Sequence, residues 1–89
     1  MMQPAEALDR LRGAEFKAVG SHQTAKAIGK GRAQVVFLAK DADRRVVESV
    51  VSAARDRGVE VIEIASMREL GRACGIAVGA SAAAILMSP

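Results

Sequence analysis

The stretch QVVFLAKDADRRVVESVVSAARDRGVEVIEI, residues 34–64, decides the fold. Its first six residues are mostly apolar and partly β-branched, which predicts a short buried strand at 34–39. Its last six residues alternate apolar and acidic side chains, which predicts a strand at 59–64 with one face in water. Between the two strands we expect a helix that Asp41 or Asp43 caps and that ends at Gly58.

The alternation of helices and strands continues on both sides of this stretch. Upstream, the pattern predicts a helix at 5–12, a strand at 16–19 and a second helix that Ser21 caps and that ends near Gly29. Downstream it predicts a helix opened by a capping box at 66–69, a loop at 75–79 and a last buried strand at 82–87. We therefore expect an α/β fold, a three-layer α/β/α sandwich with a small mixed central sheet, as one domain over residues 1–89.

Composition restricts the core and excludes several classes of protein. The 89 residues include 18 Ala, ten Val and only two aromatic residues, so the core must be aliphatic and closely packed. One cysteine, Cys74, and one histidine, His22, exclude a disulfide framework and a metal cluster, and no cofactor is expected. No secretory signal is visible at the start of the chain, so we expect a cytoplasmic protein.

The end of the chain could be mistaken for a membrane span. Residues 73–89 carry no charge, and Gly71, Gly75 and Gly79 form two overlapping G-x-x-x-G motifs. A spanning helix needs about 20 apolar residues, whereas this stretch has 17, of which four are Gly or Ser. We therefore expect no membrane partner.

The positive charge is concentrated in one third of the chain. From Lys17 to Arg45 there are seven Lys or Arg against two Asp, a balance of +5, whereas residues 1–16 and 46–89 each sum to −1. Such a concentration indicates a surface that binds a polyanion. The alternative is a basic surface that is merely solvated.

Catalytic interpretations find little support in the sequence. The residues around Gly29 and Lys30 do not form a phosphate-binding loop, because residue 24 is Thr and Lys30 is followed by Gly. Asp41 and Asp43 precede a helix, where aspartate is an ordinary cap. Cys74 has no base near it in sequence, so we interpret it as a small buried side chain. The protein is not expected to be an enzyme.

One face of the second helix offers hydrogen-bonding and cationic groups together. His22, Gln23 and Lys26 share that face by their spacing, and Lys30 extends it by one turn. If Ser21 caps the helix, its first backbone N–H groups point outward at the positive end of the helix dipole. These groups suit phosphate and the edges of bases, although an ordinary polar helix surface would look the same.

Two long blocks make the sequence recognisable: GSHQTAKAIGKGRAQVVFLAKDAD at 20–43 and SMRELGRACGIAVGASAAAI at 66–85. In both blocks, and over about residues 5–87, the chain resembles the ribosomal protein L7Ae family, which includes L30e and small bacterial homologues. The resemblance implies binding to kink-turn RNA, in which tandem sheared G·A pairs flank a three-nucleotide bulge and bend the helix. The family signature Asn-Glu-x-x-Lys falls on His22, Gln23 and Lys26, so only the lysine is kept here.

The resemblance also assigns a role to the apolar loop before the last strand, which packs on bulged nucleotides in the family. Unstacked bases are what proteins commonly read in RNA. From the residues alone, Ile76 and Val78 could equally turn inward to the core. The residues expected to bind RNA are therefore Gly20, Ser21, His22, Gln23, Lys26, Lys30, Arg32, Ile76, Ala77, Val78 and Gly79.

The expected partner is structured RNA, such as ribosomal RNA or a riboswitch, with association to the ribosome and without binding to DNA. Two other classes stay open. The chain could be a protein-interaction adaptor on the same fold, because a fold does not dictate its site. It could also be the RNA-targeting domain of a modifying enzyme, although no linker is visible in the sequence.

Overall fold

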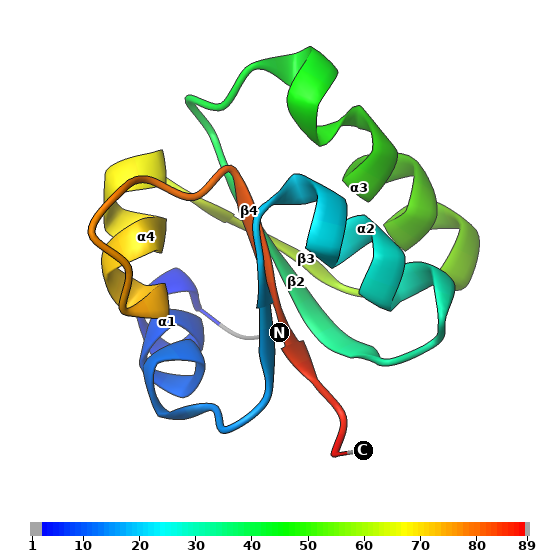
Figure 1. Cartoon of the computed structure of the whole chain (residues 1–89), viewed down its shortest axis with the longest axis horizontal. Coiled ribbons are helices and arrows are strands. Elements are labelled where there is room, and N and C mark those ends of the chain that lie inside the picture. The colour runs from blue at the N-terminus through cyan, green and yellow to red at the C-terminus, as the bar shows by residue number, and fades with distance from the viewer. Residues whose placement is uncertain (1–2, 89) are drawn as a thin grey trace.

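Helices and strands alternate along the whole described chain (Figure 1). The computed structural model describes residues 3–88. In chain order the elements are α1 (Pro4–Gly13), β1 (Lys17–Val19), α2 (Ser21–Gly29), β2 (Ala33–Ala39), α3 (Arg44–Arg57), β3 (Val61–Ile64), α4 (Met67–Cys74) and β4 (Ala82–Leu86). Each element expected from the sequence is present, and most boundaries agree within a residue.

The four strands form one mixed sheet in the order β1-β4-β2-β3. β2 and β3 run parallel, with Val36 opposite Val61, and β4 runs antiparallel to both of its neighbours. Helices α1 and α4 pack together on one face of the sheet, and α2 and α3 pack together on the other (Figure 1). The expected three-layer α/β/α sandwich with a small mixed sheet is confirmed.

Two hydrophobic clusters, one on each face of the sheet, hold the three layers together. Within β2, Val35 and Phe37 belong to the cluster under α1 and α4, whereas Val36 belongs to the cluster under α2 and α3. This division follows from the two-residue period of a strand. All three side chains are buried, as expected for a central strand that is covered on both faces.

The third strand begins at Val61, two residues later than the sequence pattern predicts. The N–H of Val59 donates to the carbonyl of Ala54 at 3.0 Å, so Val59 closes the end of α3. Gly58, at φ +66°, provides the left-handed turn that this ending requires. Val59, Glu60 and Val61 alternate apolar and acidic side chains across this point, so the hydrophobic pattern could not reveal where the helix ending stops and the strand begins.

Of the two aspartates that the sequence offers as the cap of α3, only Asp43 caps it. Asp43 caps α3, because its Oδ1 accepts from the N–H of Arg45 at 2.9 Å. The side-chain and backbone hydrogen bonds from Arg45 hold the pKa of Asp43 below its usual value. Asp41 instead accepts from the N–H of Met67 at 2.8 Å, at the start of α4. The loop after β2 therefore fixes α3 and α4 at once.

Candidate functional site

The entry into α2 depends on Gly20. Its φ of +93° lies in a region that residues with a Cβ rarely adopt, and it lets the chain turn directly from β1 into the helix. The Gly20 N–H donates to the carbonyl of Ala82 at 2.8 Å, and its own carbonyl accepts from the N–H of Thr24 at 3.0 Å. The start of α2 is thereby held against the start of β4.

The expectation that Ser21 caps α2 is wrong. Gly20 occupies the N-cap position and Ser21 is the first helical residue. A capping side chain must come from the non-helical residue before the first turn, and glycine has none. The Ser21 hydroxyl instead lies 2.7 Å from that of Ser81, across the chain. No side chain caps the first turn of α2, so its leading amides face outward at the positive end of the helix.

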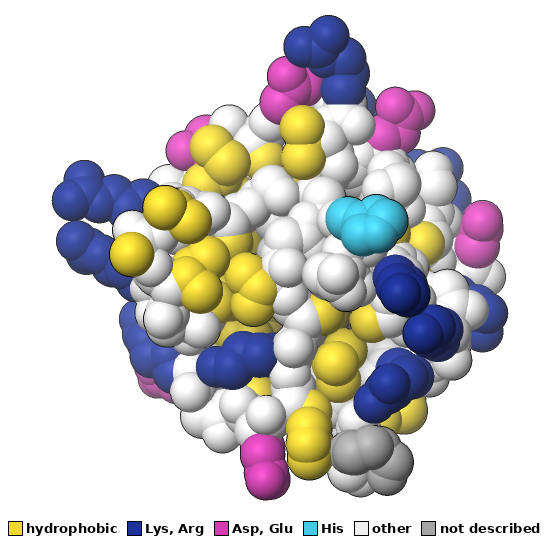
Figure 2. Space-filling view, viewed as in Figure 1, with side chains coloured by type: hydrophobic (Ala, Val, Ile, Leu, Met, Phe, Trp, Pro, Cys, Tyr) yellow, Lys and Arg dark blue, Asp and Glu magenta, His cyan; other side chains and the backbone are white. Residues whose placement is uncertain are grey.

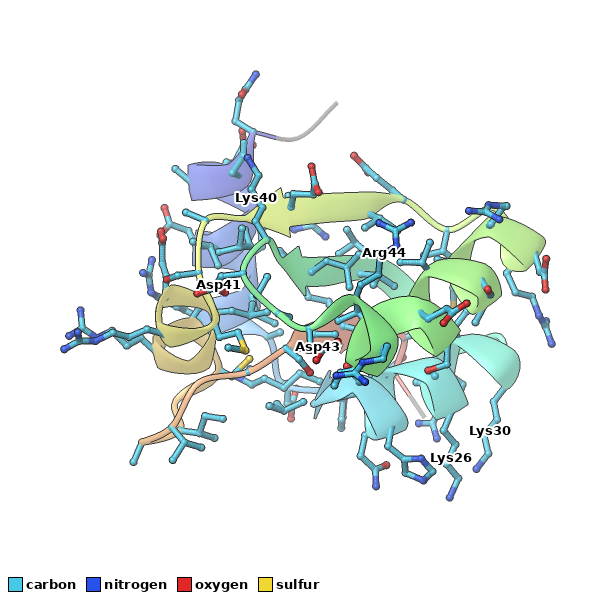
Figure 3. All side chains as sticks on the ribbon, turned by 90° about the horizontal axis from the view of Figure 1, so that it is seen from above. Lys26, Lys30, Lys40, Asp41, Asp43 and Arg44 are labelled. Carbon is cyan, nitrogen blue, oxygen red and sulfur yellow. The ribbon has the colours of Figure 1, made fainter. Side chains whose placement is uncertain are left out.

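The cations expected on α2 are brought together with Gln23. Lys26 and Lys30 project from the helix in the same direction (Figure 3). With Gln23 and Arg32 they line a hollow of about 270 Å³ beside β1 and the end of β4. Among residues 3–88, no carboxylate lines this hollow. Lys17 lines it too, but its ammonium group donates to the carbonyl of Leu11 at 3.3 Å, at the end of α1.

The segment between α4 and β4 carries its large apolar side chains into solvent. Ile76 is 37% exposed and Val78 is 70% exposed, so neither turns inward to the core. Ala77 and Gly79 are exposed as well. Isolated apolar residues on a surface need no explanation, but two in one short loop form a contact surface. We call residues 75–81 the apolar loop.

The backbone of the apolar loop lies directly on α4. The N–H of Ile76 donates to the carbonyl of Gly71 at 3.1 Å, and the N–H of Ala80 donates to that of Met67 at 2.9 Å. A Cβ at Gly71 would lie 2.1 Å from the carbonyl oxygen of Val78, so only glycine admits this approach.

Gly75 ends α4 in the left-handed conformation, at φ +79°. The glycine spacing that resembles a membrane-helix motif therefore serves the packing of the loop on α4. Within residues 3–88, no helix is both long and apolar enough to cross a membrane.

The cationic face of α2 and the apolar loop lie on the same side of the molecule. Figure 2 shows hydrophobic side chains gathered over the segment between α4 and β4, and Lys and Arg side chains over α2, separated by a strip of backbone and small polar groups. His22, Gln23, Lys26, Lys30 and Arg32 are exposed on the α2 side. The structure thus brings the expected residues of both sequence blocks onto one surface.

Two observations concern metal ligands and nucleophiles among the described side chains. No group of three or more His, Cys, Asp or Glu that could hold a metal ion occurs among the described residues. Cys74 is buried, and burial raises the pKa of its thiol, with Lys17 opposing this in part. A neutral, buried thiol is a poor nucleophile. The surface offers ammonium and guanidinium groups, amide donors and apolar contact area, which suit phosphates, base edges and unstacked bases.

Sequence reasoning missed two residues that shape this surface. Gly71 was noticed only for its spacing, although a glycine inside a short capped helix already hints at the close approach of another segment. Ser81 gave no signal, because a serine between a loop and a strand is ordinary and its partner is 60 residues away.

The fold and the surface define a small α/β domain with a cationic helix face beside an apolar loop. The sequence model of the Ribosomal protein L7Ae/L30e/S12e/Gadd45 family matches residues 5–88, and the chain belongs to this family. It is 39% identical over 79 residues to an RNA-binding protein of Bacillus pumilus, covering 89% of this chain and 96% of the relative.

A ribosomal protein and a solved structure are similar over most of the chain as well. The large ribosomal subunit protein eL8 of Halobacterium salinarum is 35% identical over 82 residues, which cover 91% of this chain and 68% of that protein. The fold matches the solved structure of the 15.5kD RNA binding protein of Giardia lamblia with a TM-score of 0.84 at 30% identity. That match covers 94% of this chain and 73% of the Giardia chain.

Proposed function

We propose that this protein binds kink-turn RNA without catalysing a reaction, through the cationic face of α2 and the apolar loop together. The observation that carries the proposal is the placement of both features on one surface (Figure 2). Relatives of 39% and 30% identity are named as RNA-binding proteins, which supports RNA as the partner. Residues 1–89 act as one domain in this proposal, in the cytoplasm and in association with ribosomal or other structured RNA.

In the proposal, the cationic face and the apolar loop contact different parts of the RNA. Lys26 approaches a guanine O6 or N7 of the sheared pairs, where a cationic donor meets two acceptors. Lys30 and Arg32, just past the C-terminal end of α2, neutralise phosphates. Ile76 and Val78 cover bases that the bulge leaves unstacked. Gln23 replaces a family carboxylate, so it donates and accepts at a base edge as a neutral amide without a charge-assisted bond.

The test compares two RNAs and two matched lysine variants. The RNAs are a kink-turn duplex and the same duplex with its G·A pairs replaced by Watson–Crick pairs. We expect Lys26→Ala to lose about 1–3 kcal/mol of binding free energy on the kink-turn and to lose the preference for it. Lys40→Ala removes the same charge from an exposed lysine on another part of the molecule, away from Lys26 and Lys30 (Figure 3), and should change little.

Salt dependence supplies a second readout of the same titrations. Contacts from Lys26, Lys30 and Arg32 to about three phosphates or base edges predict a slope of log affinity against log salt of about −2 to −3. Wild-type protein that binds both RNAs equally would refute the kink-turn proposal and leave a generic basic surface. Wild-type protein that binds neither RNA would favour a protein partner instead.

A further inference from the structure

Two serine hydroxyls join the halves of the proposed surface. Ser21 is the first residue of α2, and Ser81 is the last residue of the apolar loop before β4. Their Oγ atoms lie 2.7 Å apart, and both residues are half-buried. The backbone of Ser81 is fixed independently, because its carbonyl accepts from the N–H of Ala39 in β2 at 3.0 Å.

This contact differs from the other attachments of the apolar loop, which run to α4 and, from the Ser81 carbonyl, to β2. Ile76 and Ala80 donate to backbone carbonyls of α4, and Gly71 gives Val78 room to approach that helix. Within residues 3–88, the hydroxyl pair is the only side-chain hydrogen bond between α2 and residues 75–81. The loop is therefore attached to both helices that flank it. On the α2 side, the hydroxyl pair adds a side-chain bond to the backbone bond from Gly20 to Ala82, the residue that follows the loop.

We propose that Ser21 and Ser81 are positioning residues, whose hydroxyl pair sets the apolar loop at the right distance from the cationic face of α2. The inference rests on the proposed function. A bent RNA must meet both halves at once, so any freedom between them must be lost on binding and weakens affinity. Neither hydroxyl needs to contact RNA for this effect, and a half-buried pair is poorly placed to do so.

The test is a double-mutant cycle of Ser21→Ala and Ser81→Ala, with dissociation constants measured on the kink-turn RNA and on its G·A-disrupted control. Each single variant should bind the kink-turn about fivefold more weakly, the equivalent of one ordinary hydrogen bond. The double variant should lose no more than either single variant, because both remove the same bond. Binding to the control RNA should not change. Ser81→Thr keeps a hydroxyl and should restore most of the affinity.

Ser49→Ala is the matched control, because Ser49 is an exposed serine of α3 and has no part in the pair. It should leave both affinities unchanged. Losses that multiply in the double variant would overturn the inference, since they would show two separate contacts with RNA. Equal losses on both RNAs would overturn it too, because they would show general weakening of the fold.

Hydrogen exchange of the free protein separates this inference from the proposed function. The hydrogen-bonded backbone amides of Ile76 and Ala80 should exchange faster in both single variants, by the same factor, and no faster in the double variant. Unchanged exchange would overturn the positioning role whatever the RNA experiments give. If the wild type fails to prefer the kink-turn, the proposed function falls, and the exchange measurement alone still decides whether the pair holds the loop.

Discussion

Gly71→Ala tests whether the apolar loop is held by its contact with α4. The added Cβ would lie 2.1 Å from the carbonyl oxygen of Val78 and 3.1 Å from the Cα of Gly79. Ordinary contacts to a Cβ begin near 3.4 Å, so the loop backbone must move away by more than 1 Å. Because backbone and not a flexible side chain is in the way, the strain cannot be relieved by a change of rotamer.

The expected magnitude follows from opposing terms. Alanine in a helix is favoured over glycine by about 1 kcal/mol. Overpacking of a close contact costs about 1–3 kcal/mol, and the hydrogen bonds from Ile76 and Ala80 to α4, each worth about 1 kcal/mol, lie at the ends of the displaced segment. We therefore expect a net destabilisation of about 1–3 kcal/mol, with α4 itself still formed.

Urea denaturation followed by circular dichroism measures the stability, and titration with kink-turn RNA measures the effect on binding. Displacement of Ile76 and Val78 should weaken RNA binding by about tenfold, since about 1–1.5 kcal/mol of apolar contact is lost. Gly13→Ala is the control, because nothing lies within 4 Å of its added Cβ and its φ is not positive. It should be neutral or slightly stabilising. Gly71→Ala with wild-type stability and wild-type RNA affinity would refute the packing argument.

Three further predictions concern single side chains. Thr24→Val should stabilise the protein by about 1 kcal/mol in urea denaturation, because the Thr24 hydroxyl is fully buried and has no hydrogen-bond partner among the described residues; a loss of stability would show a hidden partner. Val78→Ala should weaken RNA binding a few-fold with an unchanged salt slope, whereas a changed slope would indicate a charged contact instead. Cys74 should resist a thiol reagent in the folded protein. Burial raises the pKa of the Cys74 thiol in the folded protein. The contribution of this thiol to the free energy of unfolding is therefore fully present below about pH 8.5, and it declines as the pH rises toward the pKa of the thiol in the folded state. Cys74→Ala should remove that decline.

The fold could be predicted from the sequence, because the helix caps and the hydrophobic pattern indicate the same helices and strands. The run at 34–39 is apolar on both faces, which only a central strand between two helix layers requires, and β2 occupies that place. Ser66 does cap α4, since its hydroxyl accepts from the N–H of Glu69 at 3.1 Å. Such caps act within four residues, so they can be predicted without knowledge of the tertiary structure.

The contacts between segments far apart in the chain could not be predicted from the sequence. Asp41 and Asp43 are equivalent as helix caps by sequence, and only the position of α4 beside the loop after β2 gives Asp41 its separate role. Ser21 looks like a cap, because capping is the commonest use of serine before a helix. Its hydroxyl binds Ser81 because the sheet places the start of β4 beside α2.

The candidate surface also has one part that the sequence predicts and another that only the structure shows. The sequence predicts a shared helical face of His22, Gln23 and Lys26 that Lys30 extends. In the structure Gln23, Lys26 and Lys30 line one hollow, and His22 does not line it. The exposure of Ile76 and Val78 could not be decided from sequence, because apolar residues usually turn inward. It depends on Gly71, which lets the loop backbone lie on α4 and so directs these side chains outward. The roles of all these residues in RNA binding stay predictions.

The bending of RNA tests the central claim most directly. A kink-turn duplex labelled with a fluorescence donor at one end and an acceptor at the other reports the distance between its ends, in buffer without divalent ions. Addition of the protein should raise energy transfer on the kink-turn and leave it unchanged on the duplex whose G·A pairs are replaced by Watson–Crick pairs. Binding to both duplexes without any rise in energy transfer would contradict the account, because the cationic face and the apolar loop would then not be engaging a bent RNA together.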